Sequence, residues 1–334
     1  MRNIYILWGL LACIAFTSCY EEDTLTPTEG GVELRFKVPQ GNNSWDDDIA
    51  QIYEDYNVYL IYKDLQRADF NRSWTGTSYG SGYEGQGCVN DEMANYYVEF
   101  MKKHIFAYLN PPITSKVLPM YWYLGYNVYS KSVLEIGGVI LASWIVPIHE
   151  NYDGLDYWCT CMFGEDNPSD PYLIPTDRAL LDRRRKMILA PVLEKAVKAG
   201  NIIIPEEFEV GFDHVTNLIA GLGREDDPNY YLTRGYPGSV NTYVFNSISE
   251  PANNSYPPTN EETFIGYMHL SMYYNQARLA EVYPADKYPF LTEKFAFVQK
   301  YLKDKYQIDL EAIANGPEDW DLPLPPIPET PDEE

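Results

Sequence analysis

The spacing of apolar and polar positions predicts strands in the first half of the chain. Apolar and charged residues alternate over residues 32–38, which predicts a half-buried strand. Residues 57–63 and 120–126 are rich in Val, Ile, Leu and Tyr and are expected to form two further strands. Residues 139–146 are almost entirely apolar, which predicts a strand that is buried on both of its faces.

Helical spacing of apolar residues recurs along the chain and is most frequent in its second half. The predicted helices cover residues 46–54, 91–108, 176–200, 259–283 and 290–306. Thr259 and Glu262 have the spacing of a capping box, and Gly200 is a typical stop signal. Pro191 is expected to kink or restart the helix that contains it. The order of these elements predicts a single α+β domain over residues 31–315.

The N-terminus has the layout of a secretory signal. Arg2 is followed by an apolar run over residues 4–16, which is shorter than the roughly 20 residues that span a bilayer. Phe16-Thr17-Ser18-Cys19 resembles a lipobox, although Leu is usual where Phe16 stands. We therefore expect residues 1–18 to be a cleaved signal peptide and Cys19 to carry acyl chains such as palmitate. Cys13 is a second candidate with a shorter apolar core, and an ordinary secretory signal or a simple membrane anchor is the remaining alternative.

Polar segments flank the predicted domain at both ends. Residues 19–30 are expected to be an acidic, flexible tether, and residues 316–334 a proline-rich acidic tail that is disordered or extended. The acidic residues at 21–23 resemble the surface-export signal of lipoproteins in Gram-negative gut anaerobes. Together with Cys19 they predict a lipid-anchored protein of the outer membrane that faces the cell exterior. The alternative is that the acidic stretch only keeps the tether solvated.

Charge and composition narrow the possible partners. The net charge of −24 opposes binding to nucleic acid and adsorption to anionic lipid. The 30 tyrosines allow a glycan-binding surface, but most of them are expected to fill strands and half-buried faces. Cys88, Cys159 and Cys161 allow one disulfide at most, and they lack the further ligands of a zinc ribbon.

Several segments together resemble the putative zinc-binding metallopeptidases that occur as lipoproteins in gut anaerobes. These segments are Tyr56 to Lys63, His104 to Pro111, Leu118 to Tyr121, Ile204 to Phe208, Val298 to Leu302 and Ile308 to Leu310. The resemblance implies a metallopeptidase-like (zincin-like) fold. It also implies a place beside the outer-membrane systems that take up glycans or peptides.

The chemistry of that family rests on a HExxH motif, in which two histidines bind zinc and a glutamate activates water. The motif should fall near residues 190–199, and this segment contains no histidine. Val192 and Ala196 stand near the expected ligand positions, and only Glu194 is retained. We therefore expect no catalytic residues, no metal ligands and no cofactor.

No other constellation replaces the missing motif. His149 and Glu150 imitate its first half but are expected to lie in a surface turn, between Pro147 and Gly154. His104, His214 and His269 are expected to be packed or partly exposed residues without a ligand role. Residues 80–85 match GxGxxG, and we interpret them as a flexible loop because no strand leads into them. The basic run at 183–186 is expected to be a solvated face or an internal ion-pair partner.

Two classes of function remain open on the sequence. The favoured one is a non-catalytic surface lipoprotein that binds a glycan, a peptide or a partner lipoprotein. The alternative is an active metallopeptidase or other hydrolase with an unrecognised site. The missing HExxH motif favours the first class.

Overall fold

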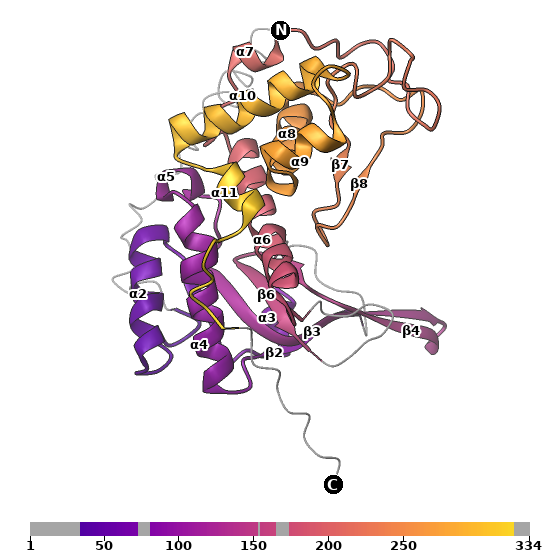
Figure 1. The fold of residues 1–334 in the computed structure, drawn as a ribbon. Coiled ribbons are helices and arrows are strands. Elements are labelled where there is room, and N and C mark those ends of the chain that lie inside the picture. The colour runs from indigo at the N-terminus through magenta and orange to yellow at the C-terminus, as the bar shows by residue number, and fades with distance from the viewer. Residues whose placement is uncertain (1–33, 73–80, 153, 165–173, 324–334) are drawn as a thin grey trace, which may run out of the picture. The chain divides into compact units, whose positions relative to one another are not determined.

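A computed structural model describes residues 34–72, 81–152, 154–164 and 174–323 (Figure 1). Residues 1–37 and 38–334 form two separate units, and of the first unit only residues 34–37 are described. Residues 34–38 form no strand, so the prediction for residues 32–38 is wrong over its described part.

A six-stranded mixed sheet is built around one long strand, β3. Its strands are β1 (Tyr59–Ile61), β2 (Gly82–Gly87), β3 (Tyr121–Ile136), β4 (Val139–Pro147), β5 (Glu150–Asn151) and β6 (Tyr157–Phe163). The first part of β3 pairs in parallel with β1 and β6. Further along, β3 pairs antiparallel with β2 and then with β4, while β5 pairs antiparallel with β6. The predictions of strands at 57–63 and 120–126 are confirmed.

Helices precede the sheet strands, separate them and fill the C-terminal half. They are α2 (Ser44–Tyr56), α3 (Arg67–Phe70), α4 (Asp91–Phe100), α5 (Pro111–Thr114), α6 (Arg178–Lys198), α7 (Glu206–Glu209), α8 (Asn260–Tyr273), α9 (Gln276–Val282), α10 (Pro289–Tyr306) and α11 (Leu310–Asn315). A π-helical turn (Met101–Ile105) and a 3-10 turn (Phe106–Tyr108) continue α4. The remaining strands, β7 (Ser239–Val240) and β8 (Ile248–Ser249), form a small hairpin. The architecture is therefore mixed α and β, as the pattern predicted.

The predicted start of a helix at Thr259 is confirmed, but the single helix expected over residues 259–283 is divided into α8 and α9. Thr259 accepts a hydrogen bond from the backbone N–H of Glu262, and the Glu262 carboxylate accepts one from the N–H of Thr259. Gly200 ends the helix before it with a φ of +76°, a conformation that suits glycine. Pro191 lies inside α6, which continues through it without a break in the helical assignment.

Buried polar side chains join the helices to the sheet. The Tyr97 hydroxyl on α4 donates to the carbonyl of Gly125 on β3 and accepts from the N–H of Met162 on β6, both at 2.7 Å. These two hydrogen bonds satisfy the hydroxyl of a tyrosine that is fully buried. They fix α4 across the sheet, and α4 forms one wall of the cleft described below.

Two strands differ from their sequence-based prediction. Residues 82–87, expected to belong to a flexible loop, form β2, and a Cβ atom at Gly87 would lie 2.4 Å from the carbonyl oxygen of Tyr62. The glycine therefore permits a close approach of two backbones. The apolar strand β4, expected to be buried on both faces, is exposed along all of its length before Pro147.

Candidate functional site

The helix that the resemblance assigns to zinc binding is α6. Val192 and Ala196, at the expected ligand positions, are fully buried in the core of the domain. Their side chains pack in the core and carry no metal-binding atom. In the part of the chain that the structure describes, no group of three or more His, Cys, Asp or Glu side chains is arranged to hold a metal ion.

Glu194, the glutamate retained from the expected motif, contacts two other side chains of the protein. Glu194 Oε1 lies 2.6 Å from Lys198 Nζ, and its Oε2 lies 3.6 Å from His269 Nε2. Burial lowers the pKa of His269, whereas the nearby Glu194 carboxylate raises it. One imidazole and one ion-paired carboxylate are too few for a catalytic zinc site, which uses three protein ligands. The prediction that His269 is a packed histidine is confirmed.

The prediction that His149 and Glu150 lie in a surface turn is wrong. Glu150 belongs to β5, and His149 is buried beside it. The Glu150 carboxylate lies 2.9 Å from the Arg184 guanidinium, and Thr160 donates a 2.6 Å hydrogen bond to its other oxygen. Burial raises the pKa of Glu150, and Arg184 opposes that rise. The flanking Pro147 and Gly154 suggested a turn, but pairing of β5 with β6 takes this segment into the interior.

The basic run on α6 is largely internal. Arg184 and Arg185 are fully buried, so the alternative of an internal ion-pair partner is confirmed for Arg184, and the solvated face is wrong. Arg185 donates to the carbonyl oxygen of Ile313, and Lys186 donates to that of Ala314. These carbonyls belong to the last turn of α11, where cations stabilise the unpaired end of a helix.

The other candidates also have structural roles. His104 is buried beside Trp320, with their ring centroids 4.7 Å apart, and Nδ1 of His214 lies 2.8 Å from the carbonyl oxygen of Pro258. The GxGxxG segment runs into β2. Cys88, Cys159 and Cys161 are free thiols, and burial raises the pKa of each. None of these residues joins a catalytic group in the described structure.

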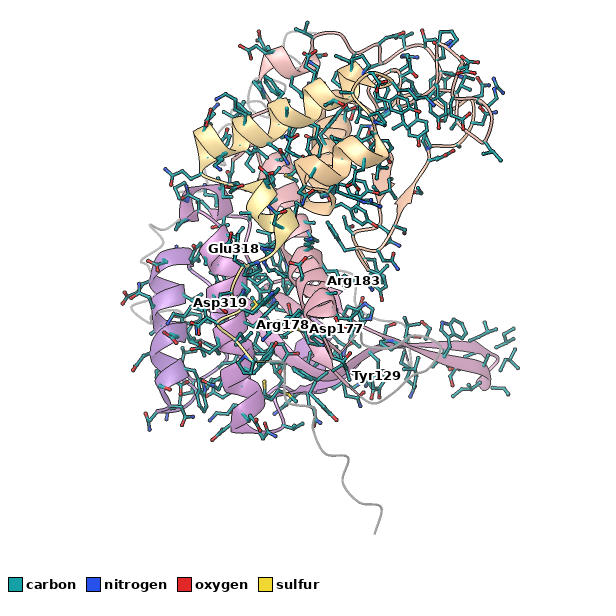
Figure 2. The ribbon with its side chains drawn as sticks, in the orientation of Figure 1. Tyr129, Asp177, Arg178, Arg183, Glu318 and Asp319 are labelled. Atoms are coloured by element: carbon teal, nitrogen blue, oxygen red, sulfur yellow. The ribbon has the colours of Figure 1, made fainter. Side chains whose placement is uncertain are left out.

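A cleft of about 710 Å³ lies between α4, the start of α6 and the C-terminal segment. We call it the Trp320 cleft. Its lining comprises Glu92, Asn95, Tyr96, Glu99, Lys103, Arg178, Asp319, Trp320, Asp321, Leu322 and Pro323. Arg178 and Asp319 mark the place where the C-terminal segment passes the first turn of α6 (Figure 2).

Two aromatic residues shape this cleft in different ways. Tyr96 is only 3% exposed, and its hydroxyl has no hydrogen-bond partner among the described residues. Burial raises the pKa of Tyr96 well above its usual value, so the hydroxyl stays neutral. The Trp320 ring is held between His104 and Arg178, whose guanidinium carbon lies 5.5 Å from its centroid. Trp320 therefore forms a fixed wall, and Tyr96 supplies an unpaired polar atom.

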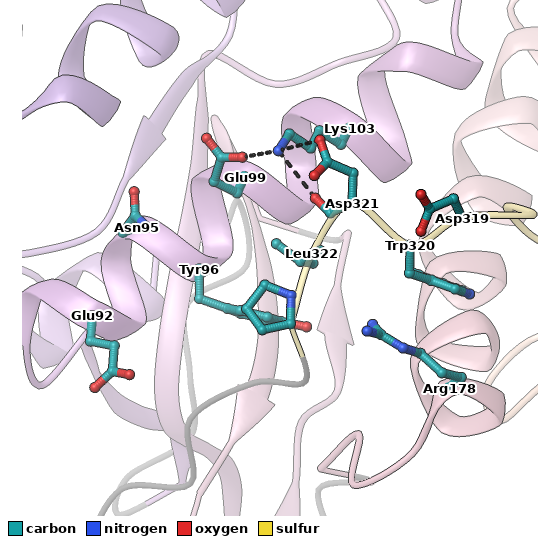
Figure 3. A pocket seen from close by; sticks show the side chains of 11 residues that line it. Glu92, Asn95, Tyr96, Glu99, Lys103, Arg178, Asp319, Trp320, Asp321 and Leu322 are labelled. Carbon is teal, nitrogen blue, oxygen red and sulfur yellow. Dashed lines mark hydrogen bonds and ion pairs between the residues drawn. The ribbon is translucent and has the colours of Figure 1, made fainter.

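Charged groups give the cleft a net negative balance. Lys103 Nζ lies 2.6 Å from Glu99 and 3.1 Å from Asp321, so these three groups form an ion-pair network (Figure 3). Glu92 and Asp319 form no ion pair with any described residue and remain available as hydrogen-bond acceptors. The cleft carries four carboxylates against two cations, which disfavours anionic ligands.

The sequence analysis missed this cleft because it assigned residues 316–334 to a tail. Residues 316–323 form no helix or strand, yet Leu322 is buried and Trp320 packs against the core. Residues 324–334 lie outside the described residues. The available signal was two apolar side chains, Trp320 and Leu322, within an acidic proline-rich stretch.

The predicted lipid anchor falls in the N-terminal segment. Residues 1–30, which include Cys13, Cys19 and the acidic tether, lie outside the described residues. Within the described part of the chain, no helix combines the length and apolar character needed to cross a membrane.

Comparisons with known proteins give one distant likeness. No family model and no curated protein matches the chain. Among solved structures, the fold is similar to a putative zinc-binding metallo-peptidase from Bacteroides caccae ATCC 43185, with a TM-score of 0.41 and 12% identity. The match covers 81% of this chain and 88% of that chain.

Proposed function

We propose that this chain is a lipid-anchored binding protein of the outer cell surface, with a metallopeptidase-like fold and without peptidase activity. In this proposal it serves an outer-membrane nutrient uptake system and binds a neutral glycan in the Trp320 cleft. The lipobox at Cys19 and the acidic residues that follow it support the location. The proposed lack of catalysis is supported by Val192 and Ala196. Both are buried at the positions where the metallopeptidase family would have its zinc-binding histidines.

The observation that carries the binding proposal is the unpaired Tyr96 hydroxyl in the wall of the cleft. A buried hydroxyl without a partner costs free energy. Side chains cover this hydroxyl in the unliganded structure, so they must shift before a ligand hydroxyl can reach it and restore its hydrogen bond. Glu92, Asn95 and Asp319 add polar atoms around the same cleft. Such a set of acceptors and donors suits the hydroxyl groups of a sugar.

A glycan fits this cleft better than an extended peptide does. A peptide strand is usually held by hydrogen bonds to an exposed sheet edge. The Trp320 cleft is walled by α4, α6 and an irregular segment and offers no such edge among its lining residues. Its excess of carboxylates also disfavours acidic polysaccharides, which leaves neutral glycans.

Affinity electrophoresis in gels that contain neutral polysaccharides tests this proposal. We expect the native protein to be retarded by at least one of them. Tyr96→Phe should weaken retardation by about fivefold in affinity, because one hydrogen bond to the ligand contributes about 1 kcal/mol. Tyr256→Ala is the matched control, because Tyr256 is an exposed tyrosine that lines a separate cleft. Equal loss in both variants, or loss only in the control, would contradict binding in the Trp320 cleft.

A further inference from the structure

A hairpin of unusual surface character is formed by the end of β3 and by β4. Its strands are joined at Gly137 and Gly138, which have φ angles of +63° and +84°. In Figure 1 this hairpin extends away from the helices of the same unit. Large apolar side chains along it are exposed, among them Ile136 at 65% and Ile140 at 62%. A cluster of large exposed apolar side chains such as this one usually marks an interaction surface.

The strand register sorts these side chains onto two faces. Ile136 pairs with Val139, and Ser132 pairs with Trp144, so all four lie on one face together with Leu134. We call this the apolar face of the hairpin. Lys131 and Glu135, the charged residues of the hairpin, lie on the opposite face together with their partners Ile145 and Ile140. A face without any charge is unusual in a chain whose net charge is −24.

We propose that the apolar face of this hairpin docks on the surface of a lipid bilayer with zwitterionic headgroups. An uncharged face gains no electrostatic attraction to a charged partner. The rest of the chain is acidic and is repelled by anionic lipid, and a zwitterionic bilayer avoids this repulsion. Trp144 supplies the amphipathic ring that favours the boundary between headgroups and acyl chains. Ser132, which pairs with it, and Ser130 are the polar residues of this face near Trp144.

Two other occupants fit less well. The apolar face presents only a handful of large side chains, whereas each copy contributes about 20–30 residues to a stable interface, which disfavours a second copy of this chain. Deep insertion is disfavoured because β4 pairs only with β3 among the described strands, and an open strand edge is costly in hydrocarbon. A hairpin that lies flat keeps both edges at headgroup level, where water can hydrate them.

This inference rests on the proposed lipid anchor for bringing the hairpin to the membrane. From Cys19 to residue 34 the chain has 15 peptide links, which can extend to about 50 Å. The anchor therefore confines the domain to a layer near the bilayer without fixing its orientation. The apolar face supplies a second contact, and two contacts hold a protein on a membrane much more firmly than one.

The test uses the full lipidated chain in phosphatidylcholine vesicles with a quencher carried by the lipid. A fluorophore is attached to Val139→Cys, or to Leu222→Cys as a matched control, because Leu222 is 99% exposed elsewhere in the same unit. The chain without an added cysteine corrects for labelling at Cys88. We expect at least twofold quenching at position 139 and little at position 222.

Each alternative outcome contradicts a different part of the proposal. Quenching that is equally weak at positions 139 and 222, in chains that float with the vesicles, would overturn the docking of the hairpin alone. Chains that do not float with the vesicles would overturn both the anchor and the docking. Energy transfer between labels at position 139 without lipid quenching would identify a second copy as the occupant.

Discussion

Oε2 of Glu194 on α6 lies 3.6 Å from Nε2 of His269 on α8. The glutamate that resembles a catalytic base therefore faces a buried imidazole from another helix. Its second oxygen is held by Lys198. Because no second imidazole stands beside this pair in the described structure, the pair joins two helices without forming a metal centre. Val192 and Ala196 on the same helix are fully buried in the core.

The buried pair of Glu150 and Arg184 gives a first prediction about stability. Arg184→Met should lower the free energy of unfolding by about 3–5 kcal/mol, because it leaves Glu150 buried without its counter-charge. Adding Glu150→Gln to this variant should recover part of the loss. Thermal or urea unfolding measures both effects. Arg183→Met, at a half-exposed neighbour on the same helix, should change stability by about 0.5 kcal/mol or less. An equal loss at both positions would contradict the assigned ion pair.

His104 predicts a dependence of stability on pH. Burial, helped by the nearby cations Arg185, Lys103 and Arg178, lowers the pKa of His104 to about 4. Between about pH 6.5 and pH 4 the unfolded chain then binds a proton that the folded chain does not bind, so stability falls as the pH falls. His104→Phe should flatten this part of the curve, because the ring is kept and the proton site is removed. Identical slopes for both proteins in urea unfolding would argue against a neutral, buried His104.

Tyr96→Phe should separate stability from binding. The hydroxyl is buried without a partner, so its removal should leave the unliganded protein as stable as before or up to about 1 kcal/mol more stable. The same change should weaken glycan binding, as described above. Differential scanning calorimetry without ligand measures the first effect. A clear loss of stability in Tyr96→Phe would mean that the hydroxyl already has a structural partner.

The proposed anchor predicts the behaviour of Cys19→Ala. Each buried CH₂ group of an acyl chain contributes about 0.8 kcal/mol to membrane binding, so two or more chains anchor a protein stably. The variant should lose the lipoprotein-type cleavage and leave the detergent phase in a phase-partition assay. Cys13→Ala is the matched control, because Cys13 is the alternative lipid site. Retention of Cys19→Ala in the detergent phase would place the anchor elsewhere.

Local signals in the sequence predicted the helices better than the sheet. The cap at Thr259 and the stop at Gly200 depend on neighbouring residues, and both were confirmed. The apolar run that became β4 was assigned to the interior because a continuous apolar strand is usually covered on both faces. The residues of this run do not indicate whether another helix or strand covers it. Its exposure became visible only in three dimensions.

The site residues were harder to predict for the same reason. Glu150 looked exposed beside a proline and a glycine, and its burial depends on Arg184, which lies 34 positions away. Trp320 lay in a segment whose composition suggested an extended tail, and its place depends on contacts with His104 and Arg178. Long-range pairs of this kind have no signature in a single sequence. The lack of histidine in residues 190–199, by contrast, is visible in the sequence itself.

Elemental analysis of the purified protein after dialysis against a zinc-containing buffer tests the central claim of a non-catalytic binding protein most directly. We predict far less than one zinc per chain and no cleavage of a protein substrate, because Val192 and Ala196 occupy the expected ligand positions and offer no donor atom. About one zinc per chain, lost together with peptidase activity on chelation, would contradict the account and establish an enzyme.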